Sequence, residues 1–202
     1  MKFSLPKKYW IATLVLIFIL TSFGVYGLSF VLFVLLALVL FVSRIKPPVF
    51  QEEVAYKDGI FYSPVNGTIR SIDENELVIV VPWWRSTGIY LPIKSEVGTL
   101  KLTEGENHFR YFPISDNDEK YSAVKATFRS DKDTYSLNFI KCFLGLWPKF
   151  MVMSGDRGMA LVNIGNFILG GTVIIKLPVG FVVNIDENTT VYVGETILAS
   201  RS

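Results

Sequence analysis

Cysteine and histidine are almost absent from this chain, which has one of each among its 202 residues. A single cysteine cannot form a disulfide within the chain, and one cysteine with one histidine cannot supply the ligands of a zinc site. We therefore expect neither a disulfide framework nor a metal site. Acidic residues are absent from the first 46 positions, which contain five basic ones, namely Lys2, Lys7, Lys8, Arg44 and Lys46.

The rest of the chain has a small acidic excess. Of the 20 basic and 18 acidic residues, 15 basic and all 18 acidic ones lie after position 46, which leaves a net charge of −3 there. Binding to nucleic acid requires a basic stripe that neutralises phosphates. The mixed charge pattern offers no such stripe, so a nucleic-acid partner is not expected.

The longest uncharged segment covers residues 9–42 and is rich in Leu, Val, Ile and Phe. As one helix it would measure about 50 Å, against a hydrocarbon core of about 30 Å. Gly24 and Gly27 interrupt it near the middle, where glycine permits a turn. The sequence therefore predicts a membrane hairpin within residues 1–46, with helices at about 9–23 and 28–43.

Basic residues flank both outer ends of this hairpin, and the positive-inside rule then places both ends in the cytoplasm. We expect a membrane-anchored protein with a cytoplasmic domain, typical of a bacterial inner membrane. Each arm is shorter than the usual span of about 20 residues, so full crossing as a transmembrane helix and shallow insertion both stay open. A secretory signal peptide is disfavoured, because the apolar stretch is about twice too long and lacks a convincing cleavage site.

The second predicted domain covers residues 47–202. Pro47 and Pro48 end the helical segment, because proline lacks an amide donor and restricts the residue before it. Short β-branched and aromatic runs separated by turn residues follow, which is typical of a β-sandwich or small barrel. These runs are at 60–62, 67–71, 77–81, 88–91, 99–102, 123–129, 135–140, 150–153, 159–164, 172–177, 181–185 and 190–193.

Two glycine-containing pieces stand out in this domain. The first is SPVNGTI at residues 63–69, and the second is the C-terminal series LGGTV at 169–173, KLP at 176–178 and VGETILA at 193–199. As local chemistry, both pieces are hairpin turns, because proline and glycine favour tight reversals between strands.

The order and spacing of these pieces, after an apolar hairpin, resemble the short, membrane-anchored type of phosphatidylserine decarboxylase. The family motifs run close to "sPaDGtv" and "fGS(T/R)V" with a final "vG..v.aGEtvlA". The resemblance implies a mostly β, sandwich or hybrid-barrel decarboxylase-like domain. It also implies cleavage of the chain before a serine, which becomes the pyruvoyl group that carries the reaction.

The position that corresponds to this serine is Gly171, in the degenerate site Gly170, Gly171 and Thr172. Glycine has no hydroxyl to attack the preceding carbonyl, so a pyruvoyl group is not expected and no cofactor is predicted. Thr172 carries a hydroxyl one residue later, which leaves an active, self-processing enzyme that makes phosphatidylethanolamine as an alternative. That alternative predicts a C-terminal fragment of about 31 residues.

The family also uses a histidine in an Asp-x-His pair as its base. The corresponding stretch at residues 83–98 contains no histidine, although KSEVG at 94–98 resembles the family's "RsPv.G". The one histidine, His108, lies farther along beside Glu104 and Glu106, as a solvated loop residue or a relocated base. Loss of both the serine and the histidine predicts a pseudoenzyme.

The leading hypothesis is therefore a noncatalytic, membrane-associated protein. Candidate contacts with the membrane surface are Trp83, Trp84, Arg85, Trp147 and Lys149, because tryptophan favours the headgroup zone and basic groups favour anionic lipid. Core packing explains such aromatic residues about equally well. Expected partners are membrane lipid and, as further possibilities, a protein partner or a second copy of the chain.

A third hypothesis is a hybrid-barrel assembly module of a membrane complex. The segments SPVNGTI and VGETILA are similar to the paired half-motifs of biotinyl and lipoyl domains. No lysine hairpin like that of those domains is present, so covalent cofactor attachment is disfavoured.

Overall fold

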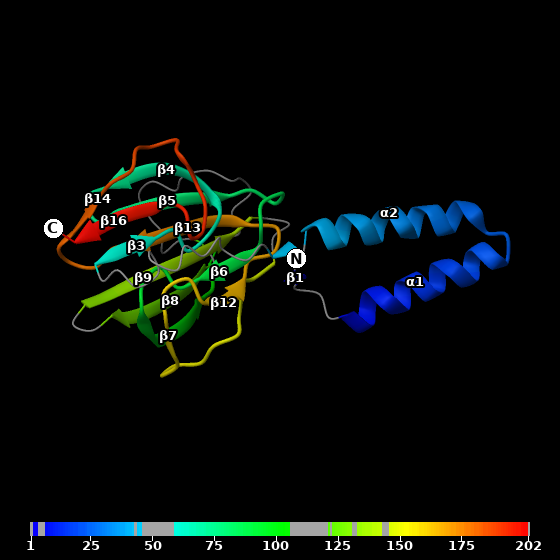
Figure 1. The fold of residues 1–202 in the computed structure, drawn as a ribbon, viewed down its shortest axis with the longest axis horizontal. Coiled ribbons are helices and arrows are strands. Elements are labelled where there is room, and N and C mark those ends of the chain that lie inside the picture. The colour runs from blue at the N-terminus through cyan, green and yellow to red at the C-terminus, as the bar shows by residue number, and fades with distance from the viewer. Residues whose placement is uncertain are drawn as a thin grey trace.

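The computed structural model describes residues 2–3, 7–42, 44–45, 59–105, 121, 123–130, 133–142 and 146–201. Two helices lie side by side at one end of the molecule, and a body of β-strands forms the other end (Figure 1). The helices are α1 (Lys7–Ser22) and α2 (Tyr26–Val42). Short strands β1 (Lys2–Phe3) and β2 (Arg44–Ile45) pair with each other, so the two outer ends of the hairpin are held together beside the β body.

The turn between the helices is a hydrogen-bonded helix cap. Gly24 has φ +75°. Its amide donates to the carbonyl of Thr21 at 3.0 Å, and the next amide, of Val25, donates to the carbonyl of Leu20 at 3.0 Å. This pattern is the Schellman motif, in which glycine takes the left-handed position after a helix. Only one of the two predicted turn glycines is used, because Gly27 lies inside α2.

Apolar side chains cover the outside of the hairpin. Phe18, Phe23 and Phe30 are 72%, 81% and 69% exposed. Among the described residues, neither helix combines the length and the hydropathy that a membrane crossing requires. The prediction of a transmembrane helix therefore finds no support in α1 and α2, because the turn divides the apolar run into arms of 16 and 17 residues.

The strands of the β body form three antiparallel sheets. The largest has the order β11-β7-β8-β9-β13-β5-β4-β15, and two three-stranded sheets have the orders β10-β12-β6 and β14-β16-β3. The strands are β3 (Ile60–Tyr62), β4 (Gly67–Asp73), β5 (Glu76–Val81), β6 (Gly88–Tyr90), β7 (Ser95–Thr103), β8 (Ala123–Ser130), β9 (Asp133–Lys141), β10 (Lys149–Phe150), β11 (Arg157–Gly158), β12 (Asn163–Asn166), β13 (Gly171–Lys176), β14 (Phe181–Val183), β15 (Thr190–Val191) and β16 (Ile197–Arg201).

The core lies against one face of the eight-stranded sheet. Successive side chains on a strand point to opposite faces, so alternate residues such as Leu137 and Phe139 on β9 enter the same cluster. Both three-stranded sheets contribute to that cluster, for example through Phe61 of β3 and Ile164 of β12. A second, smaller cluster on the other face includes Ile174 of β13. The central strands are therefore buried on both sides.

The prediction of a mostly β domain behind two N-terminal helices is confirmed. Within the described residues the sheets do not close into a barrel. The strand predicted at 159–164 is largely wrong: β12 begins at Asn163, and Leu161 has φ +63°, which a strand does not accommodate. Pro47, Pro48 and His108 lie outside the described residues, so the predictions made for them stay predictions.

Candidate functional site

The residues that match the family's cleavage site lie at the start of a central strand. Gly171 opens β13, which is flanked by β5 and β9. It pairs with Val81 of β5 on one side and with Lys141 of β9 on the other. Gly170 immediately precedes this strand, with φ +65°. The degenerate site is thus enclosed between two neighbouring strands.

Neither glycine has room for a side chain. A Cβ atom on Gly171 would overlap the carbonyl oxygen of Ile140 and lie 2.8 Å from the ring of Phe167. A Cβ atom on Gly170 would overlap the carbonyl oxygen of Val81. Gly171 also has φ +151°, which residues with a Cβ atom rarely adopt. The local backbone is therefore built around glycine, and a serine at Gly171 does not fit it.

Thr172, the alternative nucleophile, is held inside the sheet. It is 1% exposed and pairs with Val80 on β5 and with Ile140 on β9. The peptide bond before it lies in a ladder that is paired on both sides. A self-cleaving threonine must carry its oxygen to the preceding carbonyl carbon, and this paired geometry restricts that movement.

The stretch that corresponds to the family's histidine strand does not supply a base beside Gly171. Its first residues lie near that glycine. The carbonyl of Thr87 accepts a hydrogen bond from the amide of Phe167 at 2.7 Å, and the ring of Phe167 borders Gly171. Its KSEVG end lies elsewhere. Glu96 pairs with Arg129, which pairs with Thr134 of β9. Gly171 pairs with Lys141, seven residues farther along β9. That separation is about 24 Å along the sheet. The two resembling motifs are therefore far apart.

The KSEVG segment lines a different hollow. Lys94, Ser95 and Glu96 surround about 470 Å³ together with Arg129 and Arg157. Below it, the hydroxyl groups of Ser95 and Tyr135 are 2.7 Å apart. Burial raises the pKa of the Tyr135 phenol far above its usual value, and the hydrogen bond with Ser95 opposes this shift. The phenol therefore stays protonated at neutral pH and does not act as a base.

The two half-motifs meet in space. Ser63 donates its amide to the carbonyl of Thr196 at 3.0 Å, and the amide of Val193 donates to the side-chain oxygen of Asn66 at 3.0 Å. Gly67 pairs with Val191. Asn66 thus supplies the same acceptor that an aspartate would, which explains how Pro-Asn-Gly serves here in place of Pro-Asp-Gly.

All four tryptophans of the chain lie where the hairpin meets the β body. Trp10 is in the first turns of α1. The ring of Trp83 contacts that of Phe41, near the end of α2, with centroids 6.4 Å apart. Trp84 contacts Trp83 edge to face at 5.7 Å. The ring of Trp147 lies under the ammonium group of Lys141. Lys141 pairs with Gly171, at the end of the β body that faces the hairpin.

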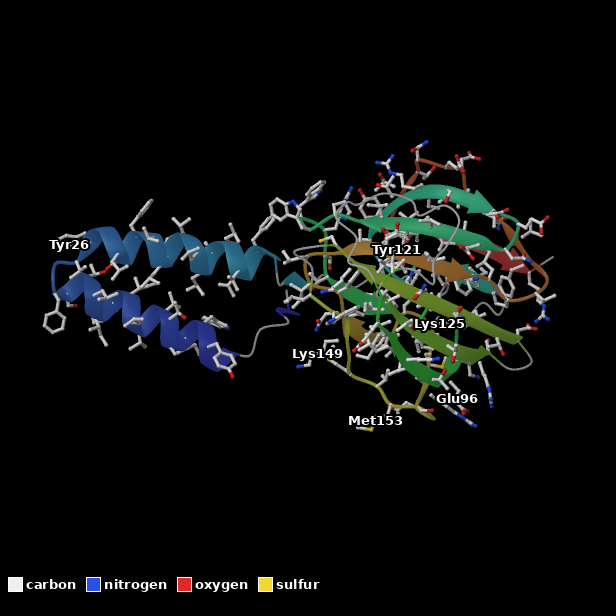
Figure 2. All side chains as sticks on the ribbon, turned by 180° about the vertical axis from the view of Figure 1, so that it is seen from behind. Tyr26, Glu96, Tyr121, Lys125, Lys149 and Met153 are labelled. Carbon is white, nitrogen blue, oxygen red and sulfur yellow. The ribbon has the colours of Figure 1, made fainter. Side chains whose placement is uncertain are left out.

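Two basic residues of this junction are held on aromatic rings. The guanidinium of Arg85 lies 5.2 Å from the ring centre of Tyr192 and donates to its hydroxyl at 3.2 Å. The ammonium of Lys141 lies 4.7 Å from the ring centre of Trp147. Lys149 is exposed near the hairpin, whereas Glu96 lies farther from it (Figure 2). The five predicted contact residues therefore gather at one end of the body.

Sequence reasoning missed three residues of this junction, namely Phe41, Lys141 and Tyr192. Each is brought there by strand register or by hairpin docking, neither of which a local pattern reveals. Among the described residues, no group of His, Cys, Asp or Glu side chains could hold a metal ion. Comparisons of the chain with protein-family models, with curated proteins and with solved structures gave no match.

Proposed function

We propose that this chain is a membrane-anchored, noncatalytic relative of the phosphatidylserine decarboxylases. In this proposal the hairpin is embedded in lipid and holds a sandwich-type β domain at the cytoplasmic surface. The observation that carries it is the apolar surface of α1 and α2. Soluble monomers rarely leave a continuous apolar surface of this kind in water.

The polar groups of the hairpin support burial in lipid. All four serine and threonine side chains of residues 9–42 donate to the carbonyl four residues earlier, at 2.8–3.0 Å. These residues are Thr13, Thr21, Ser22 and Ser29. The cap at Gly24 satisfies amides of the turn in the same way. Inside a bilayer, polar groups must find their partners within the protein, and these hydroxyls and turn amides do so.

The junction supplies the interfacial anchor. Tryptophan rings concentrate at the level of lipid headgroups because they combine an apolar ring with an N–H donor. Trp83 and Trp84 are 40% and 49% exposed at the base of the hairpin. The pairing of β1 with β2 keeps both hairpin ends at this level. The five basic residues before position 47 favour the cytoplasmic face, where anionic lipid is attracted to them.

The noncatalytic part of the proposal rests on crowding. The backbone at Gly170 and Gly171 excludes the side chain that the family's reaction begins from. Retention of the turns, with loss of the nucleophile, leaves a scaffold for a headgroup, a protein partner or a second copy. The contact between the two half-motifs also favours the assembly-module alternative, in which partner proteins rather than lipid cover the hairpin.

Depth-dependent quenching of tryptophan tests the anchor. The full chain is reconstituted into phosphatidylethanolamine and phosphatidylglycerol vesicles that contain lipids brominated at known acyl positions. We expect the shallowest bromines to quench emission most strongly, because all four tryptophans lie at the hairpin base. Unbrominated vesicles are the control. Emission that no brominated lipid quenches would exclude the lipid anchor and favour a protein partner for the hairpin.

A further inference from the structure

A second feature lies on the outer face of the eight-stranded sheet, opposite the main core. It is a groove of about 610 Å³ that spans β7, β8, β9 and β13. Its lining is Thr99, Lys101, Thr103, Tyr121, Ala123, Lys125, Thr127, Ser136, Asn138 and Lys176. Tyr121 and Lys125 lie on the side of the β body that faces the viewer in Figure 2. Eight of the ten lining residues carry a hydroxyl or an ammonium group.

Two lysines in the groove face each other across neighbouring strands. Lys101 of β7 is the direct pairing partner of Lys125 on β8. Like charges placed directly opposite each other on an antiparallel pair are destabilising. No carboxylate lines the groove, and within the described part of the chain neither lysine forms an ion pair. The third lysine, Lys176, pairs with Glu76 at 3.1 Å.

The next strand adds a polar atom that lacks a partner. Asn138 of β9 pairs directly with Lys125. Its side-chain oxygen is buried, and no hydrogen bond to it is formed within the described residues. A buried acceptor without a donor is destabilising, because it has lost its hydrogen bonds to water. The groove thus combines uncompensated positive charge with an acceptor that needs a donor.

We propose that this groove binds a phosphate ester that also carries a hydroxyl or amino group. The ammonium groups of Lys101 and Lys125 bind phosphate oxygens, which offsets their mutual repulsion. The hydroxyls of Thr99 and Thr127 are 2.7 Å apart and hydrogen-bond each other, which leaves the Thr103 hydroxyl to donate to the phosphate. The hydroxyl or amino group of the ligand donates to the Asn138 oxygen. This chemistry is shared by a free phosphorylated polyol and by a lipid headgroup, and it does not depend on the proposed membrane anchor.

Calorimetric titration of the full chain in uncharged detergent micelles tests the groove. The probes are sn-glycerol 3-phosphate, inorganic phosphate and dihexanoylphosphatidylglycerol. We expect an ester with free hydroxyls to bind more tightly than inorganic phosphate, and Lys125→Gln to weaken that binding at least tenfold. Lys94→Gln, on an exposed lysine outside both the groove and the junction, is the matched control with unchanged affinity.

The stability of the variants separates binding from folding. Because Lys125→Gln removes a like-charge pair, its melting temperature is expected to equal or exceed that of the wild type while its affinity falls. Asn138→Leu is expected to remove the preference for glycerol phosphate over inorganic phosphate. If glycerol phosphate binds more tightly than the short-chain lipid, the ligand of the groove is a free phosphate ester. If the short-chain lipid binds more tightly, the ligand is a lipid headgroup. Both support the site.

Three results would overturn the proposal. The first is no binding of any probe up to about 10 mM, a concentration that would detect even very weak sites. The second is unchanged affinity in Lys125→Gln. The third is an equal loss in Lys125→Gln and Lys94→Gln, which would indicate general charge attraction and no defined groove.

Discussion

Gly171→Ser is expected to destabilise the protein by about 2–6 kcal/mol, although it restores the residue that the decarboxylase family carries. The new Cβ atom overlaps the carbonyl oxygen of Ile140, and overpacking of this kind costs about 1–3 kcal/mol. The positive φ adds strain of about 1–3 kcal/mol. Urea unfolding of the full chain in detergent micelles measures the difference. No chain cleavage is expected in the variant.

Gly155→Ser is the matched control for this substitution. Gly155 also has positive φ, at +94°, but nothing lies within 4 Å of the position of its Cβ atom. Gly155→Ser introduces backbone strain without overlap. Its loss of unfolding free energy should therefore be smaller than that of Gly171→Ser by at least about 1 kcal/mol. Equal stability of the two variants would show that the site has room for serine. Self-cleavage of Gly171→Ser would show that the catalytic machinery is intact.

Charges on the hairpin should remove the protein from membranes. We expect the double variant Phe18→Asp and Phe33→Asp to lose vesicle binding by about 10⁴-fold, because each aspartate in the apolar part of a helix costs about 2.5–3.5 kcal/mol. Both phenylalanines are exposed, at 72% and 54%. Flotation of the chain with pure lipid vesicles in a density gradient measures the effect without any protein partner.

An exposed valine on the β body supplies the control for flotation. Val179 is 81% exposed, so Val179→Asp makes a comparable change on an apolar residue away from the hairpin. It should float like the wild type. If the hairpin variant also floated like the wild type, the membrane anchor would have to lie elsewhere, and the apolar surface of α1 and α2 would need a different explanation.

The architecture could be predicted where the signal is local. The uncharged run at residues 9–42 is too long for one helix, and the structure divides it at Gly24 as glycine permits. Strands β5 and β9 were predicted because their β-branched and aromatic residues form short runs between turns. Strand β11 has only two residues, Arg157 and Gly158, and such a strand exists only because β7 pairs with it.

The site required information that a single sequence does not contain. The absence of serine at Gly171 is visible in the sequence, but its cause, the Ile140 carbonyl of a strand thirty-one residues earlier, depends on register. The same holds for the opposed lysines, Lys101 and Lys125, whose charges look like an ordinary solvated pattern until the strands are aligned. Contacts set by register were therefore the part that sequence reasoning could not reach.

The central claim joins two properties, a chain held in lipid and a chain that is never cut. Mass spectrometry of the intact protein recovered from the floated vesicle fraction tests both together. The account predicts one species of 22.8 kDa in that fraction. A break between Gly170 and Thr172, with a C-terminal fragment of about 31 residues, or recovery of the whole chain outside the lipid fraction, would contradict it.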